Sequence, residues 1–320
     1  MIKVENKKVY ISVNNIVKSY ADKIVNKNIN LEIFKGEIYC LAGPNGSGKT
    51  TLIRQMMGLE KPDSGTIFIE GDESLKGSKN SKFIGNYVSY QPQNVNGLLR
   101  GLKVKEAIYY VGKLKKMQKN KCREEVDRLI DLFQIKYLKD SLVSSLSGGE
   151  RQLVNLCMTF IGYSPILVFD EPTNNLDVEK REVFIKEIMR CRKECNSTIL
   201  LITHDLIEFE KVIDRIGIMF NGEILIIDSP STLCKESNDL IKIILKHSSR
   251  LLTKILKEEG YEIFDEKDYN YLIASKKDFN DIFNITQGFI NEGVELSVSS
   301  INLQDKYFSI INNKGELENA

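Results

Sequence analysis

Short continuous apolar runs, each followed by polar or glycine residues, organise the chain. These runs are residues 38–42, 166–169 and 198–203, and a stretch with helical spacing, residues 178–194, separates the last two. Continuous apolar runs of this length are typical of strands that are buried on both faces of a parallel sheet. The alternation of strands and helix predicts an α/β fold with a parallel core sheet and right-handed crossovers.

Other segments flank this core. Three of them have strand character and are bounded by turns, namely residues 9–13, 30–33 and 66–69. They predict a small antiparallel layer laid against the core. Residues 216–227 predict a hairpin, because Asn221-Gly222 at its centre suits a type I′ turn. Residues 104–133 have a lysine-rich helical pattern, which favours a solvated helix face over a surface near anionic lipid headgroups.

The pattern changes after a polar segment at residues 229–238. Strand and helix patterns then alternate in a β-α-β-α-β order, over residues 240–245, 250–259, 271–274, 277–292 and 294–298. This order predicts a small α+β domain, in which we find no catalytic motif. The chain is therefore expected to form two domains, residues 1–230 and residues 231–320.

Composition narrows the class of protein. With 42% hydrophobic and 28% charged residues among 320, the chain is typical of a soluble protein, and a net charge of +1 argues against nucleic acid as a principal partner. The amino terminus does not resemble a signal peptide, and no stretch approaches the roughly 20 apolar residues needed to cross a bilayer. The six cysteines form no C-x-x-C pair, which indicates free thiols in a reducing cytosol.

One glycine-rich motif carries the strongest chemical signal. It follows the first apolar run and reads G-x-x-x-x-G-K-T, the pattern of a phosphate-binding P-loop. Its glycines allow backbone N–H groups to point inward at an anion, and the helix that follows directs its positive dipole end there. Lys49 adds a charge for the outer phosphates, and the Thr50 hydroxyl suits Mg²⁺. The residues are Gly43, Pro44, Asn45, Gly46, Ser47, Gly48, Lys49 and Thr50, with Thr51 next.

Three reactive side chains follow the other two core strands. Asp170 and Glu171 come after one run and His204 after the next. Ligands of open parallel sheets bind at the carboxyl ends of strands, so these side chains are expected to converge with the P-loop on one nucleotide. Asp170 suits a Mg²⁺ contact, Glu171 suits activation of the attacking water, and His204 suits the γ-phosphate. The alternatives are two solvated acids and a structural histidine.

A second helix start also suits an anion. Ser147 and Glu150 form an S-x-x-E capping box around Gly148 and Gly149, at the beginning of a predicted helix. Together these motifs resemble the nucleotide-binding subunit of an ATP-binding cassette (ABC) transporter over about residues 8–230. The resemblance assigns the signature to residues 146–152, the Q-loop glutamine to Gln93, the Walker B strand to 166–172, the D-loop to 174–177, the switch histidine to His204 and the adenine-stacking aromatic to Tyr20.

The resemblance implies a function for each of these positions. Glu171, His204 and Gln93 would be catalytic, and Thr50, Gln93 and Asp170 would hold Mg²⁺. ATP would be bound by the P-loop, by Tyr20 and by the signature residues of a second subunit. Gln91 competes with Gln93, although the family places its glutamine after the proline, and Tyr20 could instead be a packed core aromatic.

The family also implies an architecture and partners. The expected fold is a P-loop NTPase with an antiparallel β subdomain and a helical signature subdomain, followed by the small α+β domain. One P-loop and one signature imply a homodimer or heterodimer that sandwiches two ATP molecules. Separate integral membrane permease subunits would dock around residues 94–99 and the helix after Val104. The chain would then be cytoplasmic and peripheral on the inner face of the membrane.

The C-terminal region and the tail at residues 300–308 resemble those of bacterial export subunits, which favours export over import. The alternative is a soluble ABC ATPase with a translation- or nucleic-acid-linked role. Translation factors of this family usually carry two cassettes in one chain, and the chromosome and repair members insert long coiled coils where this chain has only residues 72–140.

Overall fold

The computed structural model describes residues 8–70, 72–73, 87–93, 99–235, 239–265 and 268–319. The chain divides into two units, Met1–Asp228 and Ser229–Ala320, which are described separately. In the part of the chain that the structure describes, no helix has the length and apolar character that crossing a membrane requires.

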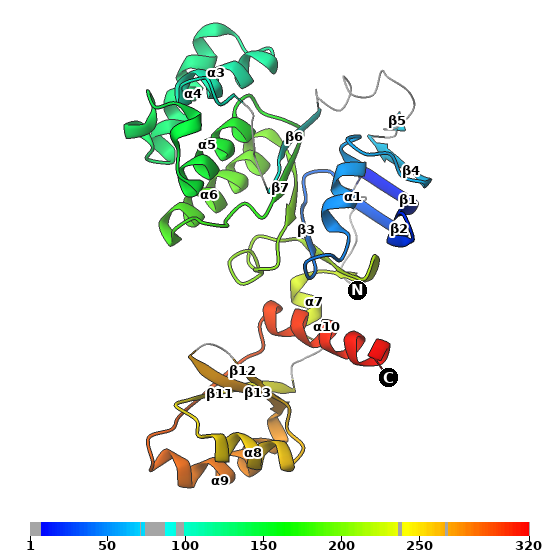
Figure 1. Cartoon of the computed structure of the whole chain (residues 1–320), viewed down its shortest axis with the longest axis vertical. Coiled ribbons are helices and arrows are strands. Elements are labelled where there is room, and N and C mark those ends of the chain that lie inside the picture. Colours follow the sequence, from blue (N-terminus) through cyan, green and yellow to red (C-terminus); the bar gives the residue numbers. More distant parts are fainter. Residues whose placement is uncertain are drawn as a thin grey trace. The chain divides into compact units, whose positions relative to one another are not determined.

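A six-stranded sheet forms the centre of the first unit (Figure 1). Its order is β10-β9-β3-β8-β7-β6, and only β10 runs antiparallel to its neighbour. Every residue of β3, β7 and β8 is buried, which is why these strands are apolar in sequence except at Asp170 and Thr198. The predicted parallel α/β core is therefore confirmed. The strands are β3 (Ile38–Ala42), β6 (Val88–Gln91), β7 (Ile166–Asp170), β8 (Thr198–Ile202), β9 (Arg215–Phe220) and β10 (Glu223–Asp228).

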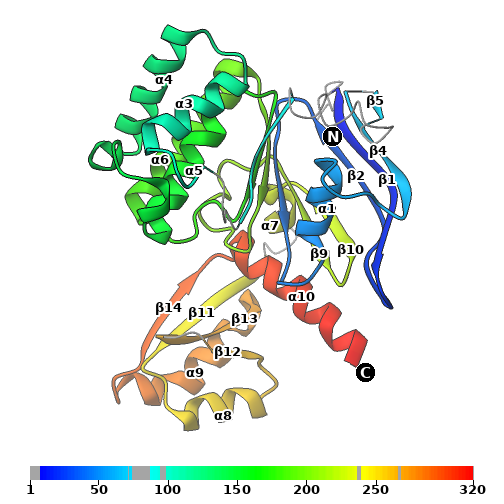
Figure 2. The ribbon, with the colours of Figure 1, turned by 45° about the horizontal axis from the view of Figure 1, so that its top comes forward.

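The antiparallel layer is a second sheet of order β2-β1-β4-β5. Its strands are β1 (Val9–Tyr20), β2 (Lys23–Phe34), β4 (Ser64–Ile69) and β5 (Asp72–Glu73), and the helix α1 (Lys49–Met56) lies beside it (Figure 2). Ile11, Ile33 and Ile67 from this sheet join Leu52 and Tyr39 in one buried cluster. Because each fully buried side chain of this size contributes about 1.5–3 kcal/mol, the cluster fixes the layer against the core.

Four helices lie on the other side of the core sheet in both views (Figures 1 and 2). They are α3 (Val104–Leu114), α4 (Lys119–Leu132), α5 (Gly148–Phe160) and α6 (Val178–Cys195). The lysine-rich helical pattern over residues 104–133 corresponds to two helices, α3 and α4. Lys116 adopts a left-handed backbone conformation, φ 62°, which ends the first helix.

A buried carboxylate connects two of these helices. Glu187 of α6 is 3% exposed, and its Oε1 accepts from Arg128 of α4 and from Arg190, each at 2.7 Å. Burial raises the pKa of Glu187, but the hydrogen bonds from Arg190 and Arg128 outweigh it and leave the pKa below its ordinary value of 4.5. The ionised carboxylate therefore stabilises the packing of α4 on α6 at neutral pH.

We expect Glu187→Ala to lower the free energy of unfolding of this unit by about 1.5–3 kcal/mol, because two guanidinium groups lose a buried partner while Arg128 keeps Glu125 and Arg190 keeps Glu194. Urea denaturation measures the loss. Glu182→Ala on the same helix is the control, since its exposed pair with Lys186 contributes only about 0.5 kcal/mol. The wild-type contribution is present above pH 4.5 and is lost as the pH falls through the lower folded pKa. Equal losses in the two variants would contradict this account.

The second unit is an antiparallel sheet of order β12-β13-β11-β14. Its strands are β11 (Leu240–Lys246), β12 (Ile263–Asp265), β13 (Tyr269–Ser275) and β14 (Glu295–Ser299), and its helices are α7 (Pro230–Lys235), α8 (Arg250–Glu258), α9 (Phe279–Ile290) and α10 (Leu303–Asn319). From β11 to β14 the order is β-α-β-β-α-β, a ferredoxin-like arrangement. The expected β-α-β-α-β order lacked β12, whose three residues are too few to produce an apolar pattern.

The two faces of this sheet are packed differently. Ile243 and Leu245 form a core with Leu252 of α8. On the opposite face the Nζ of Lys242 lies 2.6 Å from Oδ1 of Asp305 and 3.9 Å from the ring centre of Tyr271. Since Asp305 belongs to α10, this buried ion pair attaches the last helix to the sheet.

Candidate functional site

The P-loop connects β3 to α1 in a conformation that requires glycine. Gly48 has φ 104°, and a Cβ there would lie 2.5 Å from the carbonyl oxygen of Val25. A Cβ on Gly43 would lie 2.2 Å from the carbonyl oxygen of Met219. The loop is thus enclosed by backbone on two sides, and α1 begins directly after Gly48. The free N–H groups at a helix start form a binding site for an anion.

Lys49 folds back onto this loop. Its Nζ donates to the carbonyl oxygens of Gly43, at 2.6 Å, and Pro44, at 2.9 Å, and the residue is 7% exposed. Burial lowers the pKa of Lys49, although Glu171 and Asp170 oppose the change. A phosphate group bound beside this buried ammonium would stabilise its positive charge.

Asp170 ends β7 beside the P-loop. Its Oδ2 accepts from the Thr50 hydroxyl at 3.5 Å, and the residue is 2% exposed. Burial and the nearby Glu171 raise the pKa of Asp170 to about 6, although Lys49 opposes them. The hydroxyl and carboxylate that the sequence predicts for Mg²⁺ therefore meet. Mg²⁺ commonly uses one or two protein carboxylates and takes its other ligands from phosphate and water, so these residues fit that ion.

Glu171 and His204 meet at the ends of neighbouring strands. The Oε1 of Glu171 lies 2.8 Å from Nδ1 of His204, and its Oε2 accepts from the Thr203 hydroxyl at 3.2 Å. The backbone N–H of Glu171 donates to Ile202 at 2.8 Å. The carboxylate of Glu171 is therefore oriented by two side chains from the segment that follows β8.

A cavity of about 500 Å³ lies at the P-loop, and Glu171 lines it whereas His204 does not. Its lining comprises Lys23, Val25, Asn45, Gly46, Gly48, Lys49, Thr50, Thr51, Gln93, Asp170 and Glu171. Gln93 lines this cavity, whereas Gln91 is 1% exposed and lines a different one, which favours Gln93 as the Q-loop residue. Sequence reasoning missed Lys23 and Val25, because they lie beside the P-loop only through a tertiary contact of β2, in which the Asn26 side-chain amide donates to the carbonyl oxygen of Gly48 at 3.3 Å.

Other predicted site residues lie away from this cavity. Tyr20 is 47% exposed at the end of β1, where its hydroxyl donates to Glu60 and Lys18 lies 5.3 Å from its ring centre. That exposure excludes a packed core role. Three P-loop residues do not line the cavity, namely Gly43, Pro44 and Ser47. The signature residues also lie outside the lining, at the start of α5, namely Ser147, Gly148, Gly149 and Glu150.

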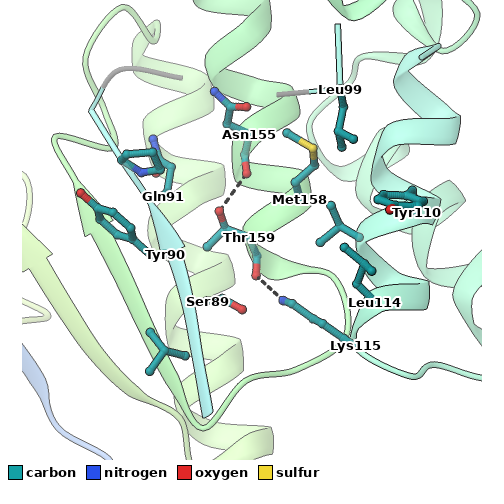
Figure 3. Close-up of a pocket in the computed structure, with 13 residues that line it drawn as sticks. Ser89, Tyr90, Gln91, Leu99, Tyr110, Leu114, Lys115, Asn155, Met158 and Thr159 are labelled. Carbon is teal, nitrogen blue, oxygen red and sulfur yellow. Dashed lines mark hydrogen bonds between the residues drawn. The ribbon is translucent and has the colours of Figure 1, made fainter. Parts of the chain in front are cut away.

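The second cavity lies between β6, α3 and α5 and measures about 340 Å³ (Figure 3). Tyr110, Leu114 and Met158 give it apolar walls. Lys115 also lines it and donates to the carbonyl oxygens of Thr159, at 3.0 Å, and Ile161, at 2.5 Å. Burial lowers the pKa of Lys115 to about 8. The buried side-chain amide of Gln91 has no hydrogen-bond partner in the part of the chain that the structure describes.

Comparison with known proteins gives consistent matches. The family model described as ABC transporter matches residues 26–174. The chain is 33% identical over 232 residues to the Fe(3+) ions import ATP-binding protein FbpC of Photobacterium profundum, covering 72% of this chain and 64% of that protein. It is 33% identical over 261 residues to the sulfate/thiosulfate import ATP-binding protein CysA of Pseudomonas syringae, covering 79% and 77%. The chain thus spans slightly less than two thirds of the first relative and more of the second.

Solved structures show the same fold. A dimeric ATP-binding cassette, MJ0796, in a post-hydrolysis state bound to ADP and Pi matches with a TM-score of 0.63 and 24% identity, over 68% of this chain and 98% of that one. The cbiO1 protein of Clostridium perfringens, part of an ABC transporter complex, matches with a TM-score of 0.62 and 24% identity, over 78% and 96%. On the sequence relatives and the shared fold together, the chain belongs to the family of ABC transporter ATP-binding proteins.

Proposed function

We propose that this chain binds ATP with Mg²⁺, hydrolyses it, and thereby powers an ABC transporter through separate membrane permease subunits. The observation that carries the proposal is the convergence of Lys49, Thr50, Asp170 and Glu171 on one cavity at the P-loop. Residues 1–230 would form the nucleotide-binding domain and residues 231–320 an accessory domain. The chain would work on the cytoplasmic face of the membrane, held there by the permease.

Each side chain has a role that its position supports. The P-loop N–H groups and Lys49 would bind the phosphates of ATP. Mg²⁺, when bound, would neutralise charge on the outer two phosphates. Thr50, Asp170 and Gln93 would hold that ion. Glu171 would accept a proton from the attacking water, since a carboxylate beside the γ-phosphate can act as a general base. His204 would keep the Glu171 carboxylate oriented through the 2.8 Å contact.

We infer that the active unit is a dimer, of two copies or of this chain with a related one. The signature residues at the start of α5 lie outside the cavity that the P-loop lines. They would instead complete the site of the second subunit, where the glycine-rich helix start would contact the phosphates and Tyr20 of the P-loop subunit would stack on the adenine.

The second cavity is our proposed docking site for the permease. Its lining includes Pro92, which directly precedes Gln93, and Leu99. Residues 94–98 of the expected docking region lie outside the described residues. Its apolar walls suit an inserted apolar side chain, and the unpaired amide of Gln91 suits a backbone peptide group of the inserted segment. Docking here would connect movement of α3 and α5 to the membrane helices.

We expect Leu114→Glu to reduce co-purification with the permease about tenfold or more, because it places a charge in the apolar cavity. The measurement co-expresses the chain with the permease that its purification from detergent extracts recovers, and purifies the complex in detergent. ATP hydrolysis by the isolated chain should not change. Leu251→Glu is the control, since Leu251 is similarly exposed on α8. Normal recovery of the Leu114→Glu complex would remove the docking assignment.

The transporter role itself depends on that membrane partner. Purification of the wild-type chain from detergent extracts is expected to recover a permease, and recovery of only ribosomes or DNA would favour a soluble ABC ATPase instead. The direction of transport stays a prediction. The relatives named above are import proteins, which favours import, whereas the C-terminal tail favoured export. In inverted membrane vesicles supplied with ATP, an exporter would accumulate its substrate inside the vesicles, whereas an importer would release it.

A further inference from the structure

One side chain of the signature helix reaches the segment that carries Glu171. Gln152 lies on α5, and its Nε2 donates to the carbonyl oxygen of Pro172 at 2.9 Å and to that of Glu171 at 3.4 Å. Gln152 is 8% exposed, so water does not compete strongly for these bonds. A single amide group therefore connects the helix that begins at the signature to the residue proposed as the general base.

The backbone of Glu171 needs such support. Its φ is 50°, in the left-handed region, which is unfavourable for a residue with a side chain. Strained residues of this kind persist only where their surroundings hold them. The N–H of Glu171 donates to Ile202 at 2.8 Å, whereas its carbonyl is held by Gln152 and by the N–H of Asn174 at 3.4 Å. Because this backbone sets the direction of the carboxylate, loss of the Gln152 bond would let the carboxylate move.

The same helix start meets this segment at a second point. A Cβ on Gly149 would lie 3.1 Å from the carbonyl oxygen of Asn175, which itself has φ 63°. The signature thus packs closely against the residues that follow Glu171. A small shift of α5 would therefore be transmitted to Glu171 through both contacts.

We propose that Gln152 is a positioning residue that links the signature of each chain to that chain's own Glu171. This inference rests on the proposed function, in which a signature closes over the ATP held by the other subunit. Closure on the partner's ATP would then move α5 and, through Gln152, fix the Glu171 carboxylate beside the chain's own ATP. The two sites of the dimer would hydrolyse ATP cooperatively for this reason.

The test replaces the amide by an apolar side chain of similar length. We expect Gln152→Met to lower kcat for ATP about tenfold and to leave KM within about twofold, since no contact with ATP is removed. The Hill coefficient for ATP should fall from near 2 to near 1. Gln134→Met is the matched control, because Gln134 bonds the side chains of Lys180 and Glu179 rather than the backbone of Glu171 or Pro172.

A double-mutant cycle separates positioning from general damage. If Gln152 acts through Glu171, the losses caused by Gln152→Met and Glu171→Gln should not multiply when combined. Gln152→Glu serves as a second variant of nearly equal size whose ionised group cannot donate, and the same loss of kcat and of cooperativity is expected. Wild-type kcat and Hill coefficient in either folded variant would overturn the inference, whereas an inactive wild-type chain would overturn the proposed function.

Discussion

Glu171→Gln should lower the rate of ATP hydrolysis about 10²–10⁴-fold, because the amide cannot accept the proton of the attacking water. Phosphate release at saturating ATP measures this loss. The substitution keeps the shape of the side chain, so ATP binding should persist. The glutamine can still face Thr203 and His204, which hold the two carboxylate oxygens in the wild-type chain. The variant is therefore expected to bind ATP without hydrolysing it.

That arrest has a second observable consequence. Since the dimer is proposed to close on ATP and to reopen on hydrolysis, Glu171→Gln should accumulate as an ATP-bound dimer in size-exclusion chromatography with Mg²⁺ and ATP. The wild-type chain should be mainly monomeric under the same conditions once its ATP is consumed. Glu182→Gln on the exposed face of α6 is the control and should behave as wild type. Unimpaired hydrolysis by Glu171→Gln would remove Glu171 as the base.

Lys49→Ala should weaken ATP binding about tenfold to a hundredfold. A hydrogen bond to a charged group contributes about 1.5–3 kcal/mol, and each 1.4 kcal/mol is a factor of ten in affinity. Titration with a fluorescent ATP analogue measures the change. The fold should tolerate the loss, because burial of the ammonium is unfavourable, and its removal offsets the loss of the two hydrogen bonds to carbonyl oxygens.

The matched control is Lys186→Ala, which removes an exposed lysine on α6. Its ATP affinity should equal that of the wild-type chain. Thermal unfolding without nucleotide should give similar midpoints for both variants and for the wild type, whereas added ATP should raise the midpoint much less for Lys49→Ala. Wild-type affinity in Lys49→Ala would exclude the P-loop as the triphosphate site.

Local sequence rules determined the centre of this molecule. The buried parallel strands were recognisable because both of their faces must be apolar, and the P-loop was recognisable because its glycines and Lys49 follow such a strand at a fixed spacing. Asp170, Glu171 and His204 could be expected at one edge because parallel strands end together. These inferences needed no knowledge of distant contacts.

Only the tertiary structure decided the features that depend on distant segments. It separated Gln93 from Gln91, because Gln93 lines the P-loop cavity and Gln91, two positions away, lines the second cavity. It also placed Lys23 beside the P-loop and Gln152 against Glu171. A local pattern records which face of an element is apolar, but the partner of that face lies elsewhere in the chain. Sequence therefore determined which reactive side chains lie at the strand ends, and packing determined which other residues position them.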